Sequence, residues 1–265
     1  RTVIYSDRRF TYQEAQDVIE TGRGDLSDEI LLLNDLAQKL RAERFRNGSI
    51  NFERDEAKFE LDENGKPLRV YFKEIKESNQ LIEEFMLLAN RKVAEFVGRK
   101  RKGVQNSDRT FVYRIHDKPN TDKMAQFRSF VTRFGYQMKA QGNKAVAKEI
   151  NRLMKKIHGR KEENIISTLA IRSMAKATYS TDNIGHYGLA FDYYTHFTSP
   201  IRRYPDMMVH RLLERYLEGG RSVVKAKYEE KCDHCSTMEQ VAANAERASI
   251  KYKQVEFMQD KLGMV

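Results

Sequence analysis

One segment of alternating polar and apolar residues interrupts a chain whose other apolar residues mostly recur every three or four positions. The segment covers residues 49 to 75, and Asn64-Gly65 within it is a typical hairpin turn. It predicts a small antiparallel sheet. The spacing elsewhere predicts helices, three of them over 121 to 178 with breaks near 135–142 and 159–161. The pattern therefore predicts an α+β fold that is mostly helical.

Sequence signals also mark where helices begin. Thr11 and Glu14 have the T-x-x-E spacing of a capping box, and Ser236 and Glu239 form a second one before a long amphipathic helix. Ser27 is expected to cap another helix. That helix is predicted to bury one apolar face, formed by Ile30, Leu33, Leu36, Ala37 and Leu40.

Three more elements follow from local patterns. A helix is expected after Ser78, and residues 111 to 115, FVYRI, predict a strand. Pro205 suits the first turn of a helix over roughly 205 to 218. The helix after Ser78 is predicted to carry an apolar stripe of Leu81, Ile82, Phe85, Met86, Ala89, Val93 and Phe96.

Composition narrows the class of partner. The 265 residues are 40% hydrophobic, without a linker, so one domain over 1–265 is predicted. Lys and Arg number 48 against 38 Asp and Glu, a net charge of +10. This excess favours nucleic acid; the alternative is surface basicity without a partner. The chain lacks the ~18-residue apolar run of a membrane span and a secretory signal, so we expect a cytoplasmic protein. Its initial Arg indicates a piece of a longer protein.

The densest candidate for chemistry is YYTHFTSPIRRYPDMMVHRLL, in which a proline-bounded loop precedes a helix. Ser199, Arg202 and Arg203 on this loop are expected to face a phosphate, with the helix N-terminus adding partial positive charge. The alternative is that the arginines pair with Asp206 or Asp192 and only hold the loop.

Other candidates each have a structural alternative. Phe52 and Tyr12 lie near arginines and are candidates for stacking on a base, or they are core residues. His196 and His210 are either bases or hydrogen-bonded structural residues.

A complete metal site is not predicted. The aspartates of the second half are scattered, with no close D-x-D grouping, at Asp108, Asp117, Asp182, Asp192 and Asp206. Cys232 and Cys235 supply half of a zinc site, and with His234 they are expected to be structural or incidental. Glu83 and Glu84 are adjacent on a helix and are expected to be mostly solvated.

Several motifs carry a family resemblance. HFTSPIRRYPD followed by MMVHRLL, together with ILLLNDLAQKLR, EEFMLLAN, FVYRIHDKP and AERASIKYKQVEFM, resembles the ribonuclease II/ribonuclease R family of exoribonucleases. The similarity covers essentially all 265 residues and corresponds to the later part of that family's catalytic (RNB) domain. It implies a mixed α+β domain with a narrow channel for single-stranded RNA. It also implies processive hydrolysis from the 3′ end to nucleoside 5′-monophosphates with a divalent metal, usually Mg²⁺.

The resemblance also implies roles for single residues. Arg202 matches the arginine that contacts the scissile phosphate, and Glu246 matches a glutamate bordering the active site. Phe52 matches the aromatic that clamps the terminal bases, while Tyr12 and Glu83 match positions that distinguish ribose from deoxyribose.

The family's metal-binding aspartates and the other clamp aromatic precede the region covered, and the flanking oligonucleotide-binding barrels lie outside it. We therefore expect a chain that supplies the channel wall and the phosphate-binding arginine but is inactive alone. One alternative is a non-catalytic RNA-binding module of the same fold. Another is a helical interaction protein that uses its long C-terminal helix.

Overall fold

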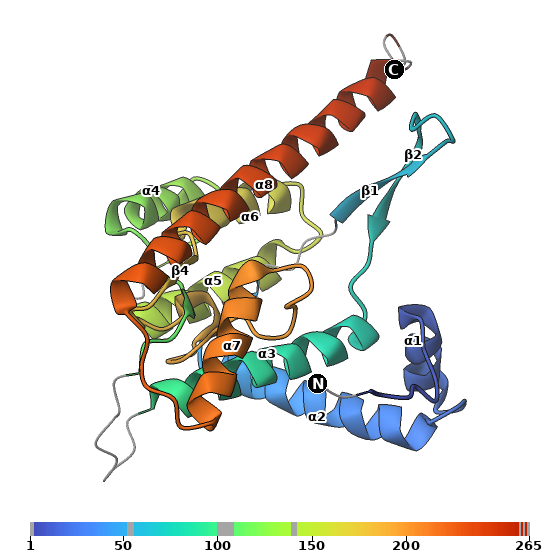
Figure 1. The fold of residues 1–265 in the computed structure, drawn as a ribbon. Coiled ribbons are helices and arrows are strands. Elements are labelled where there is room, and N and C mark those ends of the chain that lie inside the picture. The colour runs from blue at the N-terminus through green and yellow to red at the C-terminus, as the bar shows by residue number, and fades with distance from the viewer. Residues whose placement is uncertain are drawn as a thin grey trace.

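The computed structural model describes residues 3–51, 56–99, 109–138, 142–259, 261 and 263. The described residues form an α+β fold that is mostly helical, as predicted, with two small sheets (Figure 1). The helices are α1 (Tyr12–Thr21), α2 (Ser27–Arg46), α3 (Glu77–Gly98), α4 (Thr121–Thr132), α5 (Asn143–Ile157), α6 (Glu163–Ser173), the short 3₁₀ helix η1 (Tyr187–Leu189), α7 (Tyr204–Leu217) and α8 (Lys225–Gln259). The strands are β1 (Glu56–Leu61), β2 (Pro67–Lys73), β3 (Tyr113–Ile115) and β4 (Thr178–Ser180).

The predicted hairpin is confirmed. β1 and β2 pair antiparallel, with Phe59 opposite Val70, and Gly65 in the turn adopts a φ of 78°. This left-handed conformation explains the Asn-Gly signal, because glycine has no Cβ to clash there. The strand predicted over 111 to 115 is β3, which pairs with β4 in a second sheet that the sequence did not reveal.

The capping box of α1 is confirmed. Thr11 Oγ1 accepts a hydrogen bond from Glu14 N at 3.2 Å, and Glu14 Oε2 accepts from Thr11 N at 2.7 Å. The predicted helices α4, α5 and α6 are present between the expected breaks, and Pro205 lies in the first turn of α7.

Two predicted caps are wrong. Ser27 is the first residue of α2, and Leu26 occupies the cap position without a side-chain hydrogen bond. Ser236 lies inside α8, where its Oγ donates to Cys232 O at 2.8 Å and accepts from Tyr179 N at 2.9 Å. A serine hydroxyl can bond the carbonyl four residues earlier in a helix, so the S-x-x-E spacing is not by itself a helix start.

Two predicted buried faces are also wrong in part. Leu33 and Leu36 of α2 are 40% and 42% exposed, and only Ala37 of the expected five is buried. On α3, the buried positions include Glu84 and Asn90, whereas Ile82 and Phe96 of the predicted stripe are 44% and 42% exposed. Polar contacts between elements, described below, set the rotation of α3.

The core consists of two clusters of buried side chains. The first cluster joins α4, α5 and α6, and its fully buried members are Val131, Ile150, Ile157, Ile166 and Ala170. The second joins β3, β4, α7, the start of α8 and the end of α3, and its fully buried members include Ala94, Phe111, Val112, Val209 and Cys232. The loop that bears Arg202 adjoins the second cluster, because Phe197 packs against it.

The cysteines are core residues. Cys232 is fully buried within α8, and this burial raises the pKa of its thiol to about 12. Cys235 is also a free thiol. Over the described residues, no three His, Cys, Asp or Glu side chains converge as metal ligands, and no helix is long and apolar enough to cross a bilayer. The burial of Cys232 in the second core cluster is what the structural interpretation of the C-x-x-C pair predicts.

Candidate functional site

The loop that precedes α7 is fixed from its C-terminal side by Asp206. This carboxylate is fully buried, and its Oδ1 accepts a hydrogen bond from Ser199 N at 2.8 Å. Ser199 O in turn accepts from Arg203 N at 3.0 Å and from Arg202 N at 3.3 Å. The loop therefore closes on itself directly before the helix.

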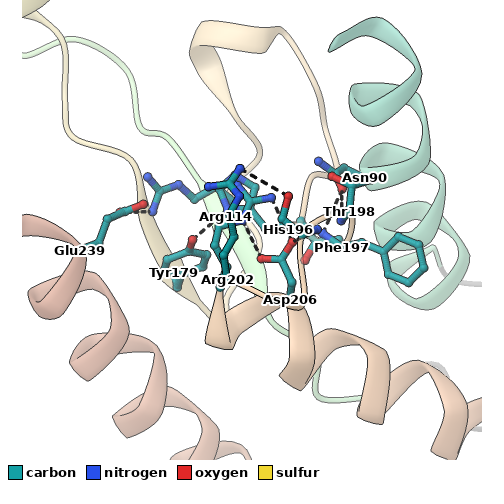
Figure 2. Close-up of polar contacts among 12 residues, drawn as sticks. Asn90, Arg114, Tyr179, His196, Phe197, Thr198, Arg202, Asp206 and Glu239 are labelled. Carbon is teal, nitrogen blue, oxygen red and sulfur yellow. Dashed lines mark hydrogen bonds and ion pairs between the residues drawn. The ribbon is translucent and has the colours of Figure 1, made fainter. Parts of the chain in front are cut away.

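Asn90 fixes the loop from the other side (Figure 2). Its side chain projects from α3, is only 3% exposed, and accepts hydrogen bonds at Oδ1 from Phe197 N at 2.9 Å and Thr198 N at 3.2 Å. Its Nδ2 donates to Tyr194 OH at 3.2 Å. One buried amide thus satisfies two backbone donors that precede the arginines.

Arg203 and Arg202 have opposite environments. Arg203 makes a bidentate ion pair with Asp206, with Nε at 3.0 Å from Oδ2 and Nη2 at 3.0 Å from Oδ1. This is the structural pairing that the sequence left open. Arg202 is exposed, its side chain donates to Ser199 Oγ at 3.4 Å, and it has no carboxylate partner among the described residues. Of the two guanidinium groups, that of Arg202 is available to an external anion.

Aromatic and basic side chains lie beside the loop. The Arg114 guanidinium lies 4.6 Å from the centre of the Tyr179 ring and pairs with Glu239 of α8 at 2.7 Å (Figure 2). Tyr179 OH lies 2.8 Å from His196 Nδ1. Burial, together with the positive charges of Arg203 and Arg114, lowers the pKa of His196 to about 2.

Neither histidine of the motif has the environment of a base. The low pKa leaves His196 neutral, and its Nδ1 shares a hydrogen bond with Tyr179 OH, while burial raises the pKa of Tyr179 itself. His210 Nε2 lies 2.8 Å from the carbonyl of Phe197, which can only accept, and its ring stacks on Phe197 at 4.1 Å. Both side chains are structural in the described conformation.

The remaining predicted residues are spread along the fold. Glu246 is exposed on α8, two turns after Glu239 and therefore on the same side of the helix. Tyr12 is 51% exposed at the start of α1. Glu83 is 48% exposed on α3, with Oε1 at 3.7 Å from Arg44 Nη2. Phe52 lies outside the described residues.

Tyr12 and Arg202 do not meet. Helix α1 is tied to the start of α3 by Gln16 Oε1, which accepts from Ser78 N at 3.0 Å. Asn90, which holds the arginine loop, comes twelve residues after Ser78, about 18 Å along the helix axis. Of the two residues implied to recognise the ribose, Tyr12 therefore lies on the helix that packs at the start of α3, and Glu83 comes seven residues before Asn90, about 10 Å along the helix axis.

The prediction that Glu84 is mostly solvated is wrong, and Asn90 was not among the predicted site residues. Glu84 is 3% exposed and pairs with Arg44, which is 6% exposed, and with Arg41 at 3.6 Å. These contacts tie α2 to α3. The available signal was the spacing itself: Glu84 and Asn90 share a face with Leu81, Leu87, Ala94 and Val97, so polar residues interrupt a helical apolar stripe.

The family model described as RNB domain matches residues 1–219. The chain belongs to the RNB domain family. Ribonuclease R 1 of Lactococcus lactis is 36% identical over 99% of this chain and 33% of that protein, and ribonuclease R of Aquifex aeolicus is 34% identical over 99% and 37%. The chain thus spans about a third of the length of these relatives. Its resemblance to the ribonuclease R family is confirmed.

Solved structures agree on the fold. The apo form of Mycoplasma genitalium RNase R superposes on this RNB domain chain with a TM-score of 0.82, at 25% identity over 96% of this chain and 40% of that one. Yeast Ssd1, a pseudonuclease, superposes with a TM-score of 0.60, at 22% identity over 85% of this chain and 27% of that one. The same architecture therefore occurs in a nuclease and in a pseudonuclease.

Proposed function

We propose that this chain is part of a cytoplasmic exoribonuclease that degrades single-stranded RNA processively and hydrolytically from the 3′ end to nucleoside 5′-monophosphates. In this proposal the chain supplies part of the RNA channel, and Arg202 binds the phosphate at which cleavage occurs. The earlier part of the catalytic domain and the flanking barrels supply the rest. Support comes from the ribonuclease relatives and from Mycoplasma genitalium RNase R, which has been solved with ribose methylated single-stranded RNA.

The environment of Arg202 carries the proposal. Its loop is fixed by Asp206 and Asn90, so the backbone of the loop is set before any ligand arrives. Its guanidinium has no carboxylate partner among the described residues, whereas that of Arg203 is neutralised. An unneutralised guanidinium on a loop whose backbone is fixed can stabilise the charge that develops on a phosphate oxygen during cleavage. In the same proposal Glu246 borders this site, and Phe52, Tyr12, Glu83 and Ser199 contact RNA.

The Mg²⁺ that the resemblance implies has no ligand set in the part of the chain described. Its acidic side chains are separate or already paired, as Glu84 is with Arg44 and Asp206 is with Arg203. We propose that aspartates of the preceding part of the domain hold the metal, and no step here is assigned to it. The chain alone is then expected to release no mononucleotides from labelled single-stranded RNA with magnesium. Robust release would contradict this division of the site.

Arg202→Ala in the full-length enzyme tests the central assignment. Removal of a charge-stabilising guanidinium is expected to lower the cleavage rate about 10²- to 10³-fold with a much smaller change in RNA affinity. Single-turnover cleavage and equilibrium binding of the same oligomer measure the two effects. The matched control is Arg211→Ala, which removes an exposed arginine of α7 and is expected to change neither. Equal losses of rate and affinity in Arg202→Ala would make Arg202 an ordinary binding residue.

A non-catalytic RNA-binding module is the second candidate. The likeness to yeast Ssd1 favours it, because that pseudonuclease shares the fold. The two candidates differ in the aspartates that precede this stretch: an intact cluster favours the nuclease, and a degenerate cluster favours the binding module.

A further inference from the structure

A basic groove of about 1150 Å³ opens beside the first core cluster, and none of the described residues that line it belongs to the Arg202 loop. It lies between α5, the α5–α6 connection, α6 and the base of the β1–β2 hairpin. Six of its lining side chains are cations: Lys148, Arg152, Lys155, Lys156, Arg160 and Lys161. Glu163 is the one carboxylate in the described lining, and its oxygens already accept from Gly159 N at 2.7 Å and contact His158 Nδ1 at 3.2 Å.

The helical period of α5 places its cations on this surface. The opposite face of α5 is buried in the first core cluster through Val146, Ala147, Ile150, Leu153 and Ile157. Lys148, Arg152 and Lys155 follow one another at spacings of four and three residues, so they form one exposed row along the helix. No ion pair fixes these three side chains among the described residues. The row is therefore a concentration of unneutralised positive charge.

Helix stability does not account for this charge. Lys155 and Lys156 lie in the last turn of α5, where positive charge favours the helix dipole. Lys148 and Arg152 come earlier, and the dipole effect falls off within one turn. Arg160 and Lys161 follow the helix in the connection to α6. The cations of α5 and of the α5–α6 connection thus meet in one groove without a common structural reason.

The groove also offers flat apolar surface and hydrogen-bonding groups. Phe72 of the hairpin lines it and is 64% exposed, and Asn151 and Asn164 line the opposite side. Asn151 is held in place, because its Nδ2 donates to Ser49 O at 2.7 Å and its Oδ1 accepts from Asn51 N at 2.9 Å. The volume exceeds the roughly 300–1,000 Å³ of sites for single small molecules, which fits a longer ligand.

We propose that this groove binds a segment of single-stranded RNA by its phosphates, with a base stacked on Phe72. Rows of cations beside an exposed aromatic ring are the combination that tracks a flexible nucleic acid strand. The inference rests on the proposed function, because the bound strand is the same RNA, and it adds a second binding surface on the other core cluster. Several nucleotides of one strand then bind away from Arg202.

Salt-dependent binding of a 5′-labelled oligouridylate to the 265-residue chain tests the groove. The variant K148Q/R152Q/K155Q/K156Q is expected to bind at least about tenfold more weakly at 0.1 M salt, and the slope of log K against log salt falls by roughly 0.7 for each phosphate that the variant no longer neutralises. The matched control is K118Q/K123Q/K227Q/K231Q, which removes four exposed lysines of other segments and leaves the slope within error. Unchanged thermal unfolding of both variants excludes misfolding.

The outcomes separate the two proposals. If both quadruple variants lose the same RNA affinity, then only the net charge of the chain matters, and the proposal that the groove binds RNA is overturned. If the groove variant binds RNA as tightly as the wild type, the groove proposal is overturned too. A cleavage defect of Arg202→Ala would still support the proposed function in that case. Absence of any RNA binding by the wild-type chain would overturn both.

Phe72→Ala supplies an uncharged test, and an affinity about tenfold weaker at unchanged salt slope is expected when one base has no ring to stack on.

Discussion

At the scale of single residues, the most informative contrast is between two adjacent arginines. Arg202 and Arg203 are identical in chemistry, but Arg203 lies three residues before Asp206, whose buried carboxylate it neutralises. The guanidinium of the preceding residue, Arg202, is exposed, so the same dipeptide supplies one structural and one available cation. The sequence could identify the loop and both possible roles. It could not assign them, because the assignment depends on which side chain reaches the buried Asp206.

Unfolding experiments distinguish the two arginines. Arg203→Met leaves the fully buried Asp206 without its charged partner and is expected to destabilise the fold by about 3–5 kcal/mol. Arg202→Met removes an exposed side chain and is expected to change stability by less than about 0.5 kcal/mol. Urea denaturation curves of both variants measure the difference. The double variant R203M/D206N should recover part of the loss, since the uncompensated charge is then gone; equal effects of the two single substitutions would contradict this contrast.

At the scale of elements, α3 connects the parts of the site. Along one buried face it carries Glu84, which pairs with α2, and Asn90, which binds the backbone before the arginine loop. A buried ion pair and a buried amide take the place that apolar side chains would have in an ordinary amphipathic helix. For this reason the rotation of α3 differs from the one that its apolar residues predict.

Asn90→Ala tests this function of α3. The substitution leaves the amides of Phe197 and Thr198 without their buried acceptor, and each unsatisfied group is expected to cost about 1–3 kcal/mol. Because the effect is local, hydrogen exchange at these two amides should accelerate by more than the global stability loss alone explains. Asn244→Ala on the exposed side of α8 is the control and should leave both rates unchanged. If the Phe197 amide of N90A is as protected from hydrogen exchange as in the wild type, then the loop keeps its conformation without the Asn90 side chain.

Local sequence signals predicted helices, strands and turns far better than they predicted which residues are in contact. The capping box at Thr11 and the Asn64-Gly65 turn were sufficient because they act within a few residues of the chain. Ser236 shows the limit, since its S-x-x-E spacing occurs in the middle of a helix that packs on β4. The sequence motif around Arg202 was sufficient to name candidate residues on its loop, whereas Asn90 and the groove cations of α5 were not among the predicted site residues. Their significance arises only where separate segments meet.

At the scale of the whole molecule, two core clusters carry two cationic surfaces. The first cluster bears the basic groove, and the second adjoins the loop of Arg202. Ile50 N of the first cluster donates to Gly188 O at 2.8 Å, and Tyr187 N donates to His116 O at 2.8 Å, next to Ile115, which packs against the second cluster, so the segment around η1 ties the two together. The ring of His186 lies beside that of Tyr194, 5.3 Å between centres, in the same region. Neutral histidines therefore lie where the clusters join.

This location predicts that the fold loses stability in mild acid. Burial lowers the pKa of His186 to about 3 and that of His196 to about 2, whereas an unfolded histidine titrates near 6.5. The unfolded chain then binds more protons below pH 6.5, so the stabilisation is complete above that pH and declines as pH falls toward the folded values. Between pH 6.5 and 5 each histidine is expected to contribute up to about 2 kcal/mol of this loss. Urea unfolding at both pH values measures it.

Substitutions assign the acid sensitivity to these two side chains. His186→Asn and His196→Asn keep an acceptor near the original Nδ1 but cannot take up a proton, so each should flatten the pH dependence even if it lowers stability at pH 7. His234→Asn, on the exposed surface of α8, should leave the pH dependence as it is in the wild type. If H186N and H196N lose stability between pH 6.5 and 5 as steeply as the wild type, then other groups titrate in that range. The junction of the two clusters would then not be the acid-sensitive part of the fold.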